Sequence, residues 1–150
     1  MPITWVQAAN FTGLQAPVIG QLRGGVPGAT DYEASIGTGT TAGELTQTGQ
    51  FTWTNGSTYP VSYSFDTTLN RVRLAIGATT VQHVHPTPLT PERVFLLAVT
   101  RAATQVTRWT NLAITATATA EVAALPDVIS TGNGTAALLV SGAFRQGFTL

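Results

Sequence analysis

Residues 61–76 have the sequence VSYSFDTTLNRVRLAI, and their alternation of side chains decides the fold class. A period of two places every second side chain on the same face of a β-strand. Between the two alternating halves, Asp66 to Asn70 contains the residue types that favour turns. The stretch therefore predicts an antiparallel hairpin with one apolar face, made of Val61, Tyr63, Phe65, Val72, Leu74 and Ile76. A slip of one residue would carry Arg71 and Arg73 into the core, so we expect a firmly set register.

Further strands are predicted on both sides of this hairpin. Phe51 and Trp53 alternate with threonines before an Asn55-Gly56 turn. The segment 94–100 is apolar on both faces, which is typical of a central strand covered on each side. Strands are also expected at 105–111, at 112–120, where alanines alternate with threonines, and at 136–140, which is apolar. Residues 77–93 contain three prolines and predict a connection without a strand. Strands at about ten-residue spacing predict an all-β fold, a single-domain β-sandwich or jelly roll.

The composition agrees with this fold class and bears on the surface of the protein. Of the 150 residues, 27 are threonine, which is stiff at χ1 and suits a pleated sheet, and none is lysine. Only 9% of the residues are charged. Lysine is a usual defence of exposed sheet edges, and a surface so poor in charge lacks protection against association. We therefore expect a protein that packs against neighbours.

Net charge and cysteine content limit the classes of partner and cofactor. Seven arginines balance seven acids, so no long-range field gathers phosphates or anionic lipid, and nucleic acid is not expected as a partner. The absence of cysteine removes disulfides, thiolate metal sites and thiol nucleophiles. The apolar runs are far shorter than the ~20 residues of a membrane helix, so no membrane insertion is expected. The N-terminus also has no leader pattern, and we expect none in this form of the chain.

The domain organisation predicted from the sequence is an arm followed by a body. Residues 1–30 mix short apolar pieces with glycine and proline and predict an extended N-terminal arm, mostly irregular, with one or two short strands. Residues 31–150 then form the β-sandwich domain. The arm has two interpretations, a loop wrapped over its own sandwich or an arm that reaches a neighbouring subunit.

Several runs resemble a known family over most of the chain. These runs are Asn10 to Leu14, Phe51 to Gly56, Tyr59 to Tyr63 with Phe65-Asp66, Arg101-Ala102, Asn111 to Ile114 and Gly147 to Leu150. Together they resemble the bacterial, cyanobacterial-type choice-of-anchor W β-sandwich domain. The resemblance implies a non-catalytic, secreted domain with a leader and a C-terminal anchor. The printed chain shows neither pattern, so the resemblance supports the fold and leaves open a part of a virion released by lysis.

Two groups of residues have the chemistry of a metal or catalytic site. His83 and His85 are two apart, so on a strand both rings face one way, and only Glu92 is near in sequence as a third ligand. Asp31 and Glu33 are the paired carboxylates that a glycosidase uses, although the glycines around them favour a solvated turn. Calcium binding through Asp31, Glu33 or Asp66 with Asn70 is a further alternative, but Asp66 and Asn70 are better explained as shaping the hairpin loop.

No Gly-x-Ser-x-Gly elbow or phosphate-binding glycine motif occurs. We therefore predict no catalytic residue, no metal and no cofactor. The preferred interpretation is a structural protein that forms a homo-oligomer, such as a trimer, and binds a major capsid or other surface protein as a phage decoration or cement protein on the capsid exterior. The alternative is a secreted cell-surface or matrix domain, with carbohydrate affinity, and a third is an enzyme of the concanavalin-like sandwich class. The expected contact residues are Trp5, Phe11, Trp109, Phe148 and Leu150.

Overall fold

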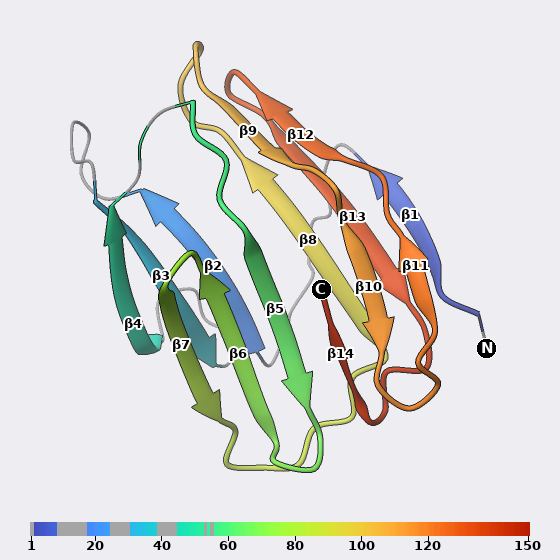
Figure 1. The fold of residues 1–150 in the computed structure, drawn as a ribbon. Coiled ribbons are helices and arrows are strands. Elements are labelled where there is room, and N and C mark those ends of the chain that lie inside the picture. The colour runs from blue at the N-terminus through green and yellow to red at the C-terminus, as the bar shows by residue number, and fades with distance from the viewer. Residues whose placement is uncertain (1, 9–17, 25–30, 39–44, 53, 55) are drawn as a thin grey trace. The chain divides into compact units, whose positions relative to one another are not determined.

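The computed structural model describes residues 2–8, 18–24, 31–38, 45–52, 54 and 56–150. Over these ranges the chain forms fourteen β-strands joined by turns and loops, and no helix (Figure 1). The strands pair antiparallel in several sheets. The predicted all-β fold is confirmed and the sheets are consistent with a β-sandwich, while the jelly-roll connectivity stays a prediction.

Contacts divide the chain into two compact units. Unit 1 consists of residues 1–14 and 90–150, and unit 2 of residues 15–89. The predicted boundary at residue 30 is at neither division, and the arm-and-body organisation stays a prediction. Within the predicted arm, the structure describes two strands, β1 (Thr4–Ala8) and β2 (Val18–Gly24).

Unit 2 contains two antiparallel groups of strands. In one, β2 pairs with β3 (Asp31–Thr38), which pairs with β4 (Leu45–Thr52). In the other, β5 (Val61–Asp66), β6 (Arg71–Ile76) and β7 (Thr79–Val84) follow one another as a meander. Asp31 and Glu33 therefore lie in a strand, β3, and the expectation that they lie in a turn is wrong.

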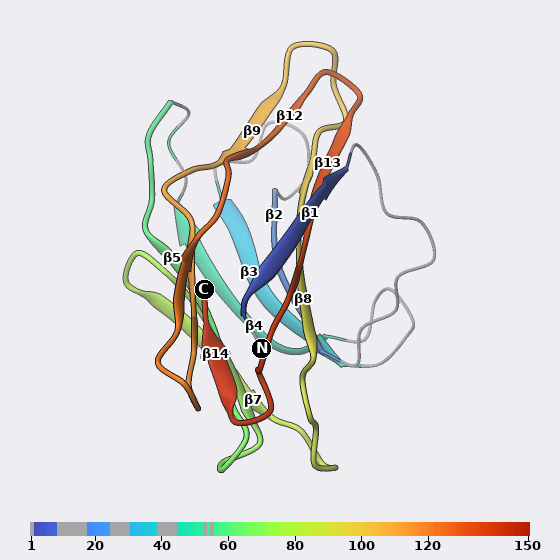
Figure 2. The ribbon, with the colours of Figure 1, turned by 90° about the vertical axis from the view of Figure 1, so that its right-hand side faces the viewer.

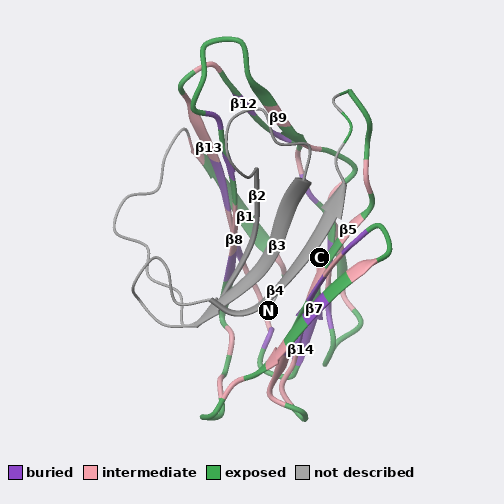
Figure 3. Cartoon of the chain, turned by 90° about the vertical axis from the view of Figure 1, so that its left-hand side faces the viewer, coloured by how far each residue is buried: buried purple, intermediate pink, exposed green. Residues whose placement is uncertain are grey.

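The β5–β6 hairpin has the register that its sequence predicts. Val61 pairs with Ile76 and Asp66 with Arg71. The apolar face is buried, since Phe65 is 4% exposed, Val72 0%, Leu74 3% and Ile76 1%, and burial raises the pKa of the Tyr63 hydroxyl well above its usual range. Figure 3 shows the burial class of the described residues, with buried ones in purple. The predicted hairpin is confirmed.

The connection predicted for residues 77–93 is wrong in its first part. Gly77, with a φ of +53°, allows a tight turn after β6, and β7 then pairs with β6 along residues 79–84. The prolines that favoured a connection lie beyond β7, between Val84 and β8. Asn70, with a φ of +48°, fixes this connection, because its side-chain amide donates to the carbonyls of His85 and Thr87, each at 2.6 Å.

Unit 1 contains a three-stranded sheet with the order β1-β13-β8. The strand β8 spans Arg93–Val99 and β13 spans Thr135–Ser141. The prediction of a central strand at residues 94–100 is wrong for this sheet, since β8 is at its edge. The outward side chains Leu97 and Val99 are 37% and 42% exposed.

Opposite this sheet, unit 1 has a bent two-stranded ribbon and one short strand. The ribbon is made of β9 (Val106–Trp109) and β10 (Ala113–Ala116) on one side and β11 (Val122–Ala124) and β12 (Val128–Thr131) on the other. Its register continues through the bend, where the Leu125 amide donates to the Leu112 carbonyl at 2.9 Å. The short strand β14 (Gly147–Thr149) pairs with β10. Figure 2 shows the sheet and the ribbon as two layers of unit 1.

The core of unit 1 fills the space between these layers. Its fully buried side chains include Ile114 and Val128 of the ribbon and Leu138 and Val140 of β13. Asn111, with a φ of +55°, lies at the bend of the ribbon, so each half presents its own apolar side chains to the core. The predicted strand at 112–120 is wrong beyond Ala116, since residues 117–120 form an exposed turn in which Ala120 has a φ of +50°.

Candidate interaction surface

Strand β1 is exposed on both of its faces, although it is part of a sheet. Trp5 is 46% exposed and Val6 is 61% exposed. Because successive side chains of a strand point to opposite faces, the two residues expose apolar surface on opposite sides of the sheet. A strand that protects only its own core has one apolar face. The exposure of β1 is therefore not explained by the packing of unit 1 alone.

The outer edge of β1 has backbone groups that the sheet does not use. The Thr100 amide donates to the Gly134 carbonyl at one end of the β8–β13 pairing, and the Gly142 amide donates to the Glu92 carbonyl at the other end. The even-numbered residues of β13 therefore direct their backbone groups to β8. Because the direction of these groups alternates along an antiparallel strand, the odd-numbered residues of β13 direct theirs to β1. The register of β1 on β13 then assigns those bonds to Thr4, Val6 and Ala8. The amides and carbonyls of Trp5 and Gln7 point away from the sheet.

Both ends of β1 are fixed to the ribbon. The Ile3 amide donates to Glu121 Oε1 at 2.7 Å, and the Gln7 side-chain amide donates to the Asp127 carbonyl at 3.1 Å. Ile3 also packs over Gly142, where a Cβ would lie 3.1 Å from Ile3 Cγ1. The edge strand is therefore held in place, and its exposed side chains are presented by a fixed backbone.

The ribbon also exposes apolar side chains, on its face directed away from the sheet. Val122 of β11 is 64% exposed and Ile129 of β12 is 42% exposed, while Val128 and Ser130 beside Ile129 are buried toward the core. These two side chains are therefore separate from those of β1. We call the exposed side chains Trp5 and Val6 of the edge strand the β1 surface. It carries no ionisable side chain of its own.

The predicted contact residues have different environments. Trp5 is on the β1 surface, and Phe11 lies outside the described residues. Trp109 is half-buried, and its indole Nε1 donates to the Leu97 carbonyl at 3.1 Å, on the free edge of β8. Phe148 is 5% exposed and lies against Phe144, with ring centroids 5.6 Å apart. Leu150 follows β14 and is half-buried.

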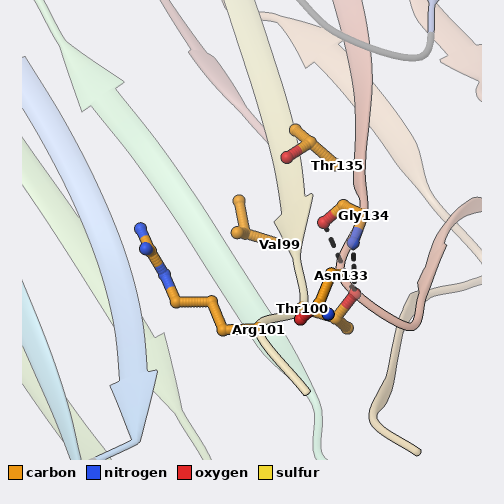
Figure 4. Close-up of a pocket in the computed structure, with 6 residues that line it drawn as sticks. All are labelled: Val99, Thr100, Arg101, Asn133, Gly134 and Thr135. Carbon is orange, nitrogen blue, oxygen red and sulfur yellow. Dashed lines mark hydrogen bonds between the residues drawn. The ribbon is translucent and has the colours of Figure 1, made fainter. Parts of the chain in front are cut away.

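A shallow hollow of about 380 Å³ lies where β8 ends and β13 begins (Figure 4). Its lining residues are Val99, Thr100, Arg101, Asn133, Gly134 and Thr135. The Thr100 hydroxyl lies 2.9 Å from the Ser130 hydroxyl and accepts the Gly134 amide at 3.3 Å. Both hydroxyls are therefore used to join the sheet to the ribbon. No acid or histidine is among the lining residues, so the hollow has no general acid or base.

His83 and His85 lie close together, with ring centroids 6.3 Å apart. His83 Nε2 is buried without a hydrogen-bond partner in the described part of the chain. Burial lowers the pKa of His83, and the neighbouring His85 lowers it further. His85 Nδ1 lies 2.8 Å from the Thr87 carbonyl. Among the described residues, no third histidine, cysteine or acid joins the pair in a metal-ligand group.

The acids proposed for a calcium or catalytic site lie in the β5–β6 loop and in β3. Asp66 Oδ1 accepts the amides of Thr68 and Leu69 at 2.9 and 3.2 Å, and Asn70 holds the connection after β7. The prediction that Asp66 shapes the hairpin loop is confirmed, whereas Asn70 contributes its positive φ to that loop and directs its side chain to the connection after β7. Asp31 and Glu33 are in β3, opposite Thr52 and Gln50 of β4.

Comparison with known proteins adds no assignment to this surface. Over the described ranges, no helix has the length and apolar character needed to cross a membrane. The chain matches no family model, no curated protein and no solved structure.

Proposed function

We propose that the protein is a non-catalytic structural protein that self-associates and coats a larger assembly. The observation that carries the proposal is the β1 strand, which exposes apolar side chains on both faces and whose outer edge pairs with no other strand in the described part of the chain. Exposed sheet edges of this kind are templates for pairing with another chain.

The energetics of burial support association at this surface. Fully burying a valine or another large apolar side chain stabilises by roughly 1.5–3 kcal/mol relative to leaving it exposed. The β1 surface offers Trp5 and Val6, which are 46% and 61% exposed. Tryptophan is also enriched among the residues that dominate binding energy at interfaces. A partner that covers either side chain therefore gains part of this contribution, because both side chains are already partly buried.

The charge of the chain supports packing against copies of itself. The formal net charge is zero and no lysine is present. Copies of the chain therefore meet no long-range repulsion, and the apolar edge has no lysine to discourage pairing. The same neutrality gives no basis for binding nucleic acid.

In its sharpest form the proposal places the protein on the exterior of a phage capsid, as a decoration or cement protein. It would form a small oligomer, such as a trimer, and bind a major capsid protein. The gene neighbourhood tests this placement. A major capsid gene beside this gene is the expected result, and a longer reading frame with a leader and a sorting segment would instead favour a secreted surface domain of the choice-of-anchor type.

One observation favours that second candidate, a cell-surface or matrix domain with carbohydrate affinity. The Trp5 side chain is 46% exposed and has the flat apolar face that sugars stack on. Trp109, in contrast, is half-buried and its N–H is bonded within unit 1. A glycan array with Trp5→Ala and Trp109→Ala tests this candidate. A glycan signal lost with Trp5→Ala and kept with Trp109→Ala would support it, and no signal on any glycan would remove it.

Light scattering coupled to size exclusion tests the self-association directly. We expect a mass above the 15.7 kDa of one chain, rising with concentration to a fixed multiple. A mass of one chain at every concentration, up to the millimolar range, would contradict the proposed self-association.

A further inference from the structure

We infer that β1 docks a second copy of the chain by antiparallel pairing of the two β1 edges, with Val6 on the two-fold axis. This inference rests on the proposed self-association and adds its geometry. The pairing would join the β1-β13-β8 sheets of two copies into one continuous sheet across the axis.

The register follows from which backbone groups are free. Trp5 and Gln7 direct their amides and carbonyls outward, whereas the Ile3 amide is already bonded to Glu121 Oε1. Pairing Trp5 with Trp5 of the copy would place Ile3 opposite Gln7 and require the Ile3–Glu121 bond to break. Pairing Trp5 with Gln7 of the copy uses the outward groups of both residues in each chain and leaves that bond intact. This register places Val6 opposite Val6 of the copy.

The side chains agree with this register. In antiparallel sheets, opposite residues whose backbone groups point away from each other have their Cα atoms only about 4.5 Å apart, and their side chains are in contact. Val6 is 61% exposed in a single chain and would be covered by its counterpart. Trp5 would lie beside Gln7 of the copy, on the opposite face.

The charge on this edge favours a second copy over a charged partner. The five residues of β1, TWVQA, contain no ionisable side chain and no proline. Within β1 no side chain repels its own copy or attracts an acidic or basic segment, and the one carboxylate recorded at this edge, that of Glu121, accepts the Ile3 amide at the end of the strand.

The test is a disulfide between two copies. The chain has no cysteine, so Val6→Cys introduces a single thiol, which on the axis faces its own counterpart. A Cα separation of about 4.5 Å is within the range that a disulfide spans. Val84→Cys is the matched control, since Val84 is 60% exposed on the edge strand β7 of unit 2. We expect mild oxidation to convert most of the Val6→Cys protein to a covalent dimer and little of the Val84→Cys protein.

A pair of second substitutions tests the hydrogen-bonding edge. In the Val6→Cys background, Trp5→Pro removes the outward amide and Trp5→Ala keeps it, while neither changes the groups that bond to β13. We expect the disulfide yield to fall at least tenfold with proline and less with alanine. Equal yields for the two variants would overturn the edge pairing.

The outcomes separate this inference from the proposed function. A wild-type oligomer in light scattering, with no more disulfide in Val6→Cys than in Val84→Cys, would overturn the β1 pairing and leave self-association standing. A wild-type monomer at every concentration, together with no disulfide, would overturn both.

Discussion

The β5–β6 hairpin and strand β1 are both made of regular antiparallel strands, but the apolar side chains of the hairpin are buried and those of β1 are exposed. In the hairpin, Phe65, Val72, Leu74 and Ile76 share one face and are all buried. In β1, Trp5 and Val6 are on opposite faces and both are exposed. The hairpin is explained by the stability of the folded chain. We propose that the apolar character of β1 reflects contacts with a second copy of the chain.

The largest effect is expected in the hairpin. Leu74→Ala removes buried methyl groups and leaves a cavity, and we expect a loss of about 2–5 kcal/mol in the free energy of unfolding. Val6→Ala is the matched change in β1 and should cost the single chain less than about 0.5 kcal/mol. Urea unfolding at a concentration where the protein is monomeric measures both. Similar losses for the two variants would remove the contrast between the strands.

A second prediction tests how tightly unit 1 is packed around Gly134, just before β13. A Cβ at Gly134 would lie 2.8 Å from the Thr131 carbonyl oxygen, a backbone atom that is not free to move away. We expect Gly134→Ala to destabilise the protein by about 1–3 kcal/mol. Gly56→Ala gives a control for the residue type, since no atom lies within 4 Å of its Cβ position, although its φ of +81° adds a smaller strain. Thermal unfolding that ranks Gly134→Ala below Gly56→Ala in stability would support the packing, and the reverse ranking would contradict it.

The hydroxyl pair of Thr100 and Ser130 should have an effect of similar size to that of Gly134→Ala. Both side chains are 3% exposed and their oxygens are 2.9 Å apart. Thr100→Val leaves the Gly134 amide and the Ser130 hydroxyl without this partner, at a cost of about 1–3 kcal/mol. The double variant with Ser130→Ala should recover part of that loss. A double-mutant cycle by urea unfolding measures the coupling, and strict additivity of the two changes would contradict a direct bond.

The smallest effect is expected from the pH dependence of stability, through the histidine His83 on β7 beside the hairpin. His83 pairs with Val72, and its pKa is lowered by burial and by His85. The unfolded chain therefore takes up a proton at a higher pH than the folded chain. Stability should be fully present above the ordinary histidine pKa of about 6.5 and fall as the pH drops below it.

Urea midpoints between pH 7.5 and pH 5 measure this effect. His83→Gln removes the titrating group and should flatten the decline. His85→Gln removes the neighbouring charge and should reduce the decline. A decline that is the same in wild type and His83→Gln would assign it to other groups.

The sequence predicts best those strands in which the alternating apolar side chains all share one buried face. Residues 61–76 have this property, and the structure confirms their register. The sequence does not predict strand β7, because the three prolines at 86–91 indicate a connection for the whole segment, although Gly77 directly after Ile76 is a turn signal. The predicted strand at 112–120 is too long, since the Ala–Thr alternation continues past Ala116 into a turn. Alternation alone does not reveal the positive φ of Ala120.

The sequence predicts the candidate surface in part. It identifies Trp5 as a contact residue, and the exposure of Trp5 is consistent with that prediction. The exposed Val122 and Ile129 of the ribbon are not predicted, because they stand in short strands without a strong pattern. Val94–Val99 is apolar on both faces and predicted a central strand, but its outward residues Leu97 and Val99 are exposed at a sheet edge. In both cases the sequence shows which residues are apolar, whereas burial depends on neighbours that alternation does not specify.

The solution mass of Val6→Lys tests the central claim most directly, with Val84→Lys as the control of similar exposure. If β1 is the edge that joins two copies, Val6→Lys places like charges opposite each other, so it should give the mass of one chain while Val84→Lys keeps the wild-type mass. Mixing Val6→Lys with Val6→Glu should then restore association. A Val6→Lys protein with the wild-type oligomeric mass would contradict the account.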